Sequence, residues 1–138
     1  MQIHGSCAAR HGAAVIVLGP SGAGKSDLVF RLIDRGFELV ADDRVDLNDG
    51  WVSAPAAIAG LLELRGLGIV RVAHCEAAKL ELAVMLGAPE RLPEPRMWDQ
   101  APVPLVSVEG HTASAAQMVE WALDCALRQR SMVAGATA

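Results

Sequence analysis

Eight consecutive residues near the N-terminus have the types and spacing of a phosphate-binding loop. They follow the pattern G-x-x-x-x-G-K-[ST] in full: Gly19, Pro20, Ser21, Gly22, Ala23, Gly24, Lys25 and Ser26. The glycines let backbone N–H groups turn toward an anion, and a helix that begins after them directs its positive end at the phosphates. In this pattern Lys25 is the cation for the β- and γ-phosphates, and the Ser26 hydroxyl is a ligand for Mg²⁺. The sequence therefore predicts a site for a nucleoside triphosphate and Mg²⁺.

Two adjacent carboxylates, Asp42 and Asp43, follow at the end of the next expected strand. Carboxylates beside a phosphate loop could hold Mg²⁺ through water and accept a proton from an attacking hydroxyl. Successive side chains of a strand point to opposite sides, so we expect the two to do different jobs. The alternative is that both are solvated turn residues.

Hydrophobic patterning places these residues on an alternating set of elements. Residues 13–18 form a continuous apolar run between two glycines, which is typical of a strand buried on both faces. Residues 25–35 have helical spacing of apolar side chains and are followed by Gly36, a plausible helix stop. Residues 37–41 form a second strand. The order strand, glycine loop, helix, strand indicates an α/β fold.

The middle of the chain has weaker signals. Asn48-Asp-Gly is a turn signal, so we expect a hairpin of residues 45–47 and 51–52. One helical turn is expected within residues 55–62. Residues 63–72 are expected to be extended, with interruptions at Gly66 and Gly68. Residues 77–86 alternate in hydropathy and predict a strand.

The C-terminal part is expected to contain a loop, a helix and a tail. Residues 89–104 are rich in proline, and we expect this loop to be among the more mobile parts without ligand. Residues 114–130 predict a helix that starts with a capping box of Ser114 and Gln117. Its apolar face is expected to contain Met118, Trp121, Ala122 and Cys125. Residues 131–138 are expected to be a flexible tail.

Composition limits the classes of function. The chain has 138 residues, of which 52% are hydrophobic and 20% charged, so we expect one domain over residues 1–130. A net charge of -4 and 4% aromatic residues argue against nucleic-acid binding. No apolar run is long enough for a membrane span, and the start has no secretory signal, so we expect a cytoplasmic protein. The three cysteines form no C-x-x-C pair, which argues against zinc.

Three stretches together resemble the catalytic, C-terminal domain of the HPr kinase/phosphorylase family. The first is Ile3-His-Gly with the phosphate loop, the second is Arg-Gly-Phe-Glu-Leu-Val-Ala-Asp-Asp-Arg-Val at 35–45, and the third is Leu-Glu-Leu-Arg-Gly-Leu-Gly-Ile at 62–69. The similarity is strong over residues 3–72 and weaker from there to 125. It implies a compact α/β P-loop domain like the HPr kinase and phosphoenolpyruvate carboxykinase catalytic core, assembled as a hexamer. Because the His-Gly element begins at residue 4, we expect the short form of α-proteobacteria, which lacks the N-terminal domain.

The resemblance also implies an activity. Members use ATP and Mg²⁺ to phosphorylate a serine of HPr, the phosphocarrier protein of the bacterial phosphotransferase system, and so regulate its signalling. Many members also run the reverse reaction, in which inorganic phosphate removes the phosphoryl group and pyrophosphate is released. The family has two arginines in a later loop tied to this reversal, and residues 104–112 lack both. This departure puts the phosphorylase activity in doubt.

The resemblance assigns roles to individual residues. Asp43 matches the catalytic base, Lys25 holds the phosphates, and His4 matches a histidine near them. Asp42 supports the metal or the geometry, and Glu63 matches a second Mg²⁺ ligand.

Two arginines complete the predicted site. Arg65 is two residues after Glu63, so in a strand both lie on one face, where a guanidinium would bind phosphate, while Leu62 and Leu64 face the core. The family's catalytic arginine has its best match at Arg91, within Glu-Arg-Leu-Pro at 90–93.

Two other functions remain open at this point. The chain could be a nucleotide-sensing binding module with vestigial transfer, which would bind ATP without phosphorylating HPr. It could also be a P-loop kinase for a small molecule, whose ATP turnover would respond to metabolites but not to HPr.

Overall fold

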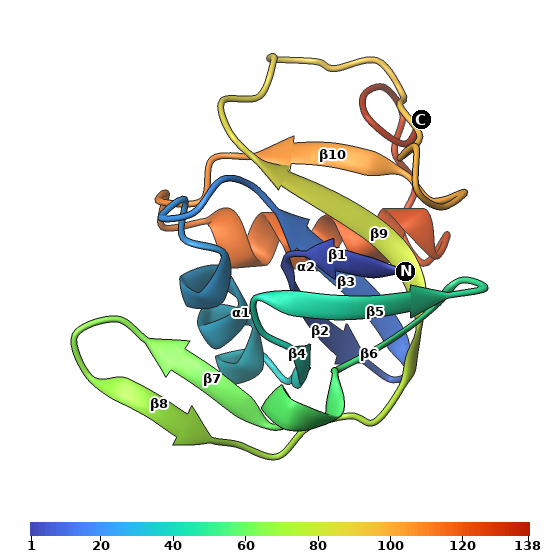
Figure 1. Cartoon of the computed structure of the whole chain (residues 1–138). Helices are drawn as coiled ribbons and strands as arrows, with labels where there is room; N and C mark the ends of the chain where they lie inside the picture. The colour runs from blue at the N-terminus through green and yellow to red at the C-terminus, as the bar shows by residue number, and fades with distance from the viewer.

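A mixed β-sheet forms the centre of the computed structural model, which describes all 138 residues (Figure 1). In its middle, β3 (Ala13–Leu18) and β9 (Ala78–Leu86) lie side by side and parallel, and β10 (Leu105–Val108) runs parallel to the second half of β9. Beyond its first residue, β3 is completely buried, and its alternate side chains enter two different hydrophobic clusters. The predicted α/β class and the strand buried on both faces are therefore confirmed.

Antiparallel strands extend the sheet on both sides. On one side β2 (Ser6–Arg10) pairs with β3, and β4 (Glu38–Ala41) pairs with β2. On the other side β6 (Trp51–Ser53) pairs with the start of β9.

Beyond β6 come β5 (Arg44–Asn48) and then β1 (Gln2–His4), in antiparallel pairs. The turn between β5 and β6 has positive φ at Asp49 and Gly50, as the predicted hairpin requires. Although β5 lies far from β2 and β4 in the strand order, it contacts both. The sheet is therefore strongly curled, so that β5 lies against β2 and β4, while the pairing of β1 with β5 places the end of β1 beside the turn between β4 and β5.

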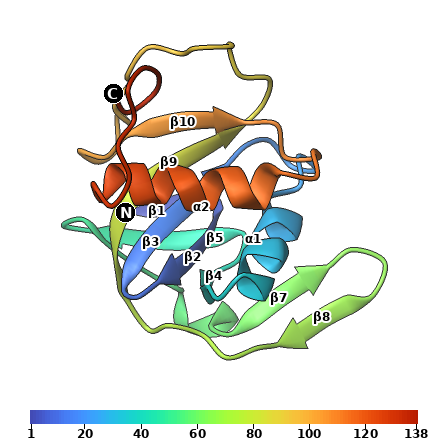
Figure 2. The same cartoon turned by 180° about the vertical axis from the view of Figure 1, so that it is seen from behind.

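Two helices cover one face of the sheet, as Figure 2 shows from behind. The helix α1 (Lys25–Asp34) buries Leu28, Val29 and Leu32 there, and α2 (Ala115–Ala126) adds Val119 and Leu123. The prediction for residues 25–35 is thus confirmed to within one residue. Neither helix is long and apolar enough to cross a membrane.

The opposite face of the sheet is covered by the curled strands and by part of the proline-rich loop. Trp98 and Val103 of this loop are buried in the second cluster, together with Ile16 of β3 and Val45 and Leu47 of β5. Residues 87–104 contain no helix or strand, as expected. Their mobility stays a prediction, but these two side chains anchor the loop's second half to the core.

A two-stranded hairpin stands apart from the main sheet (Figure 1). It follows the short 3₁₀ helix η1 (Ala56–Ile58) and consists of β7 (Leu61–Leu64) and β8 (Gly68–Arg71). Leu62 is buried against the helix-side cluster and Leu64 packs beside it, as the strand pattern predicted. Of the two glycines expected to interrupt an extended segment, Gly66 lies in the turn with φ +85° and Gly68 is the first residue of β8.

The last helix differs from its prediction. It ends at Ala126, because Arg128 adopts φ +59° and the amides of residues 129 and 130 bond back to the Asp124 carbonyl. The capping box is wrong, since Ser114 makes no side-chain bond to the helix. The side chains expected on its apolar face do share one side, but Met118 and Trp121 there are 49% and 47% exposed.

Residues 131–138 contain no helix or strand, and Ala136 packs against the helix-side cluster. That residues 1–130 are one domain with a flexible tail stays a prediction.

Candidate active site

The phosphate loop connects β3 to α1 at the edge of a cavity. Gly24 is the residue before the helix and has φ +97°, a left-handed conformation that favours glycine. No side chain caps this end of α1, so its first amides point into the loop without a side-chain partner. Free amides and the positive end of the helix dipole are what an anion requires.

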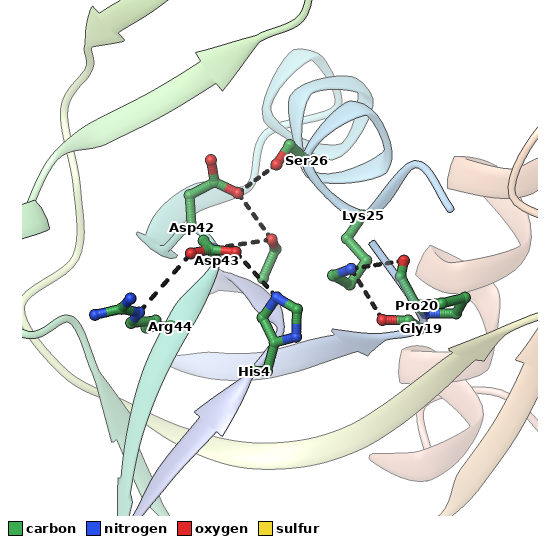
Figure 3. A network of polar contacts seen from close by, with 9 residues as sticks. His4, Gly19, Pro20, Lys25, Ser26, Asp42, Asp43 and Arg44 are labelled. Atoms are coloured by element: carbon green, nitrogen blue, oxygen red, sulfur yellow. Dashed lines mark hydrogen bonds and ion pairs between the residues drawn. The ribbon is translucent and has the colours of Figure 1, made fainter. Parts of the chain in front are cut away.

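Lys25 is the first residue of α1 and is buried within the loop. Its Nζ donates hydrogen bonds to the carbonyl oxygens of Gly19 and Pro20, both at 2.9 Å. Figure 3 shows the side chain folded back toward these two residues. The carbonyls neutralise the ammonium only partly, so a phosphate group is a strong additional partner for it.

Asp42 is a hub that joins four segments distant in sequence. Its Oδ1 accepts hydrogen bonds from the hydroxyls of Ser6 (2.8 Å) and Ser26 (2.6 Å). Its Oδ2 accepts one from the backbone N–H of Glu63 at 3.1 Å. With only 7% of its surface exposed, this carboxylate holds β2, α1 and β7 together around the end of β4.

Asp43 points away from Asp42 and into the cavity. It has φ +73°, so the chain turns sharply between β4 and β5 and the two neighbouring carboxylates diverge (Figure 3). Its Oδ1 lies 3.0 Å from His4 Nε2, and its Oδ2 lies 3.9 Å from Arg44 Nε. The two aspartates therefore contact different groups, in line with the prediction that they have different roles. A turn at Asp43 separates their side chains, and not the alternation of a strand.

A cavity of about 550 Å³ joins these groups. Nine of the predicted site residues line it, and seven of these precede the β7–β8 hairpin: His4, Ser21, Gly22, Gly24, Lys25, Ser26 and Asp43. The β7–β8 hairpin adds Glu63 and Arg65, so these two face one site as the spacing predicted, although Arg65 lies in the turn after β7. Arg65 is the only arginine that lines the cavity.

Some predicted residues lie elsewhere. Arg91 is exposed in the loop between β9 and β10 and does not line the cavity, so its catalytic role stays a prediction. Gly19 and Pro20 border a neighbouring groove that also contains His4. Ala23 lines neither space. Asp42 also lines neither, but it accepts hydrogen bonds from Ser6 and Ser26, which do line the cavity.

Other residues were missed by the sequence analysis. Ser6, Asp27, Phe30 and His111 all line the cavity. Ser6 and His111 come from strands or loops that the pattern did not resolve, so nothing in the sequence placed them near the phosphate loop. The positions of Asp27 and Phe30 could have been predicted, because both lie in the first turns of the helix that begins with Lys25 and therefore close to the phosphate loop.

The cavity contains no group of three or more His, Cys, Asp or Glu side chains arranged to hold a metal by themselves. The Ser26 hydroxyl and the Asp42 carboxylate are adjacent hard oxygen donors, which suits Mg²⁺. Because Mg²⁺ usually takes most of its ligands from water and substrate phosphates, a small protein donor set fits it.

The chain is similar to known proteins in both sequence and fold. A family model described as HPr Serine kinase C-terminal domain matches residues 1–80. The chain is 44% identical over 75 residues to HPr kinase/phosphorylase 1 of Oceanobacillus iheyensis, and 47% identical over 75 residues to HPr kinase/phosphorylase of Bacillus pumilus. Each alignment covers 51% of this chain and 24% of the relative, so the chain spans about a quarter of the curated relatives' length.

The fold comparison extends over nearly the whole chain. The structure of the Hpr(Ser) kinase/phosphatase from Coxiella burnetii superposes with a TM-score of 0.75 at 25% sequence identity. The match covers 94% of this chain and 91% of that one. The structural likeness therefore continues through β9, β10 and α2, beyond the residues that the family model matches.

Proposed function

This chain belongs to the HPr Serine kinase C-terminal domain family, and from this premise we propose that it phosphorylates a serine of an HPr-type phosphocarrier protein. The phosphoryl donor is ATP, and the reaction depends on Mg²⁺. One observation carries the proposal: the His4–Asp43 pair, at 3.0 Å, faces the same cavity as Lys25 and Ser26 of the phosphate loop. A base and a phosphate site therefore share one space, as phosphoryl transfer to a hydroxyl requires.

The reaction is an in-line displacement at the γ-phosphorus. The serine Oγ forms a bond to phosphorus while the bond to the β,γ-bridging oxygen breaks, and ADP leaves. Asp43 accepts the serine proton. The bond between His4 and Oδ1 orients the carboxylate, so Oδ2 is the oxygen that takes the proton.

Positive charge around the phosphates comes from Lys25 and Arg65. Lys25 is held at the loop by two carbonyls and can exchange these bonds for phosphate oxygens. Arg65 approaches from the hairpin, and its guanidinium offers paired donors for a phosphate group.

Ser26, Asp42 and Glu63 would hold Mg²⁺. The Ser26 hydroxyl would be a ligand, as in this loop pattern, and Asp42, whose Oδ1 accepts a 2.6 Å hydrogen bond from it, would orient the hydroxyl and support the metal. Glu63 lines the cavity from the opposite element, β7. When bound, Mg²⁺ neutralises charge on the β- and γ-phosphates and aligns them.

The broader setting follows from the family. We infer a role in regulating phosphotransferase-system signalling, in the cytoplasm, by a hexamer. The reverse, phosphorolytic reaction has less support, since the segment 104–112 lacks the two arginines that the resemblance ties to it.

The test is transfer of label from γ-labelled ATP to purified HPr, with an HPr variant in which the target serine is alanine as the matched control. We expect one phosphate on wild-type HPr and none on the variant. Tight ATP binding without any label on HPr would contradict the proposal and favour a nucleotide sensor. ATP turnover that rises with metabolites and not with HPr would contradict it in favour of a small-molecule kinase.

A further inference from the structure

We propose that His111 binds the nucleotide, with its ring donating a hydrogen bond to the diphosphate part shared by ATP and ADP, and that Arg31 positions it. This inference rests on the proposed function, because it assumes that the phosphate loop binds a nucleotide. It adds a residue from the C-terminal part of the chain to a site otherwise built from residues 4–65.

His111 lies directly on the phosphate loop. It belongs to the turn between β10 and α2 and lines the same cavity as Lys25 and Ser26. A methyl group at Gly24 would lie 3.3 Å from His111 Cε1, so the ring packs closely against the loop and would have to shift for any larger residue there. The neighbouring Gly110 packs equally closely: a methyl group there would lie 3.2 Å from the Leu86 side chain and 3.7 Å from the Ala23 carbonyl oxygen.

Arg31 of α1 donates hydrogen bonds to the backbone of this turn. Its Nη1 donates a hydrogen bond to the Thr112 carbonyl at 3.3 Å, and its Nη2 donates one to the Gly110 carbonyl. The two carbonyls flank His111 in sequence. Nη2 also lies 3.0 Å from Asp27 Oδ2, one helical turn earlier, which orients the guanidinium. Arg31 therefore fixes the backbone on both sides of the histidine.

The location of the ring decides which phosphates it reaches. In this type of loop the backbone amides surround the α- and β-phosphates, and the lysine reaches the β- and γ-phosphates. Because His111 packs on Gly24 of the loop itself, it lies beside the α- and β-phosphates. A donor there contacts ATP and ADP alike, so it contributes to binding both nucleotides by the same factor.

The experiment measures the dissociation constants of ADP and ATP, with Mg²⁺, by calorimetry on the full chain. We expect His111→Asn to weaken both by about tenfold, in keeping with one hydrogen bond to a charged group. The control is His11→Asn. His11 is exposed in the β2–β3 turn at φ +51°, a conformation that asparagine tolerates, and it lines no part of the cavity, so both affinities should stay unchanged.

A double-mutant cycle tests the role of Arg31. Arg31→Lys keeps the charge but cannot bond both carbonyls in the same planar geometry, so we expect about threefold weaker ADP binding. In the His111→Asn background the same change should have almost no further effect on ADP binding. Additive losses would mean that Arg31 acts on folding or charge alone and would overturn its positioning role.

The outcomes separate this inference from the proposed function. Unchanged ADP affinity in His111→Asn would overturn the inference, as would a loss confined to ATP, which would assign the ring to the γ-phosphate. Wild-type chain that binds ADP through His111 but leaves HPr unmodified would overturn the proposed function alone. Wild-type chain that binds no nucleotide would overturn both.

Discussion

Replacing Asp42 by asparagine tests the hub that ties the active site to the fold. The substitution keeps the shape of the side chain and removes its charge. Asparagine can direct its single oxygen at the Ser6 and Ser26 hydroxyls, but its Nδ2 then faces the backbone N–H of Glu63, so two donors meet. The opposite amide orientation satisfies Glu63 and places Nδ2 against both hydroxyls.

The magnitude follows from these three bonds. A backbone N–H left without a partner near the protein interior costs about 1–3 kcal/mol. The two serine bonds lose their charge assistance and with it roughly half their strength, which adds about 1 kcal/mol. Asp42→Asn should therefore lower the free energy of unfolding by about 2–4 kcal/mol.

Urea denaturation at neutral pH measures this loss. With a slope of roughly 2 kcal/mol per molar urea, the midpoint should fall by about 1–2 M with an unchanged slope. Asp49→Asn is the matched control, because Asp49 is an exposed turn residue that makes no side-chain hydrogen bond to a buried group, and its effect should stay within about 0.5 kcal/mol. If Asp42→Asn is as stable as this control, Asp42 is not the structural hub described above.

Three further predictions concern charge at and away from the site. Lys25→Met should weaken ATP binding by about 100-fold, as judged by calorimetry, because it removes the ammonium from the phosphates; binding within threefold of wild type would contradict this. Arg65→Ala should slow transfer to HPr by about tenfold or more, since Arg65 is the only arginine that lines the cavity; a rate near wild type in a kinetic assay would contradict this. For Asp124, burial alone raises the pKa, but hydrogen bonds and charge from its two arginine partners lower the pKa on balance. A lowered folded-state pKa stabilises the fold above the unfolded value of about 3.9, and this stabilisation is lost as the pH falls through the folded value. Asp124→Asn should therefore be less stable than wild type at pH 7, and the difference should shrink below about pH 4; a constant difference in thermal unfolding down to pH 2 would refute the linkage.

The sequence was most informative where a local pattern determines the structure by itself. The phosphate loop needs a buried strand before it and a helix after it, and residues 13–35 contain both in unbroken form. The Asn-Asp-Gly turn likewise specifies its hairpin, because its positive φ angles are favourable for few other residues. The family membership that the three stretches indicated is confirmed by the family model.

The elements that were missed depend on distant partners. β2 consists of Ser-Cys-Ala-Ala-Arg, mostly small residues with little strand propensity, and it is a strand because β3 and β4 pair with it on both sides. β10 is short and follows a proline, yet it completes the edge beside β9. The apolar face of α2 is wide enough that either of two sets of side chains could have faced the core. Packing of α2 against α1 and β9 buries Val119 and Leu123 and leaves Trp121 exposed.

The site was predictable as a set of residue types but not as a geometry. That His4 meets Asp43 follows from the antiparallel pairing of β1 with β5, in which His4 lies opposite Arg44. His111 reaches the phosphate loop from a turn whose backbone accepts hydrogen bonds from Arg31 on both sides of the histidine. Neither contact has a signal in the spacing of the chain.

The central claim is that Asp43 is the base in phosphoryl transfer to a serine of HPr. The most direct measurement is the intact mass of HPr after incubation with ATP, Mg²⁺ and either the wild-type chain, Asp43→Asn or Asp49→Asn. Both replaced aspartates are exposed and have positive φ, which asparagine tolerates, so the two variants are matched in charge and backbone strain. We predict one added phosphate with wild type and with Asp49→Asn, and unmodified HPr with Asp43→Asn although it still binds ATP. Full phosphorylation by Asp43→Asn, or none by the wild-type chain, would contradict the account.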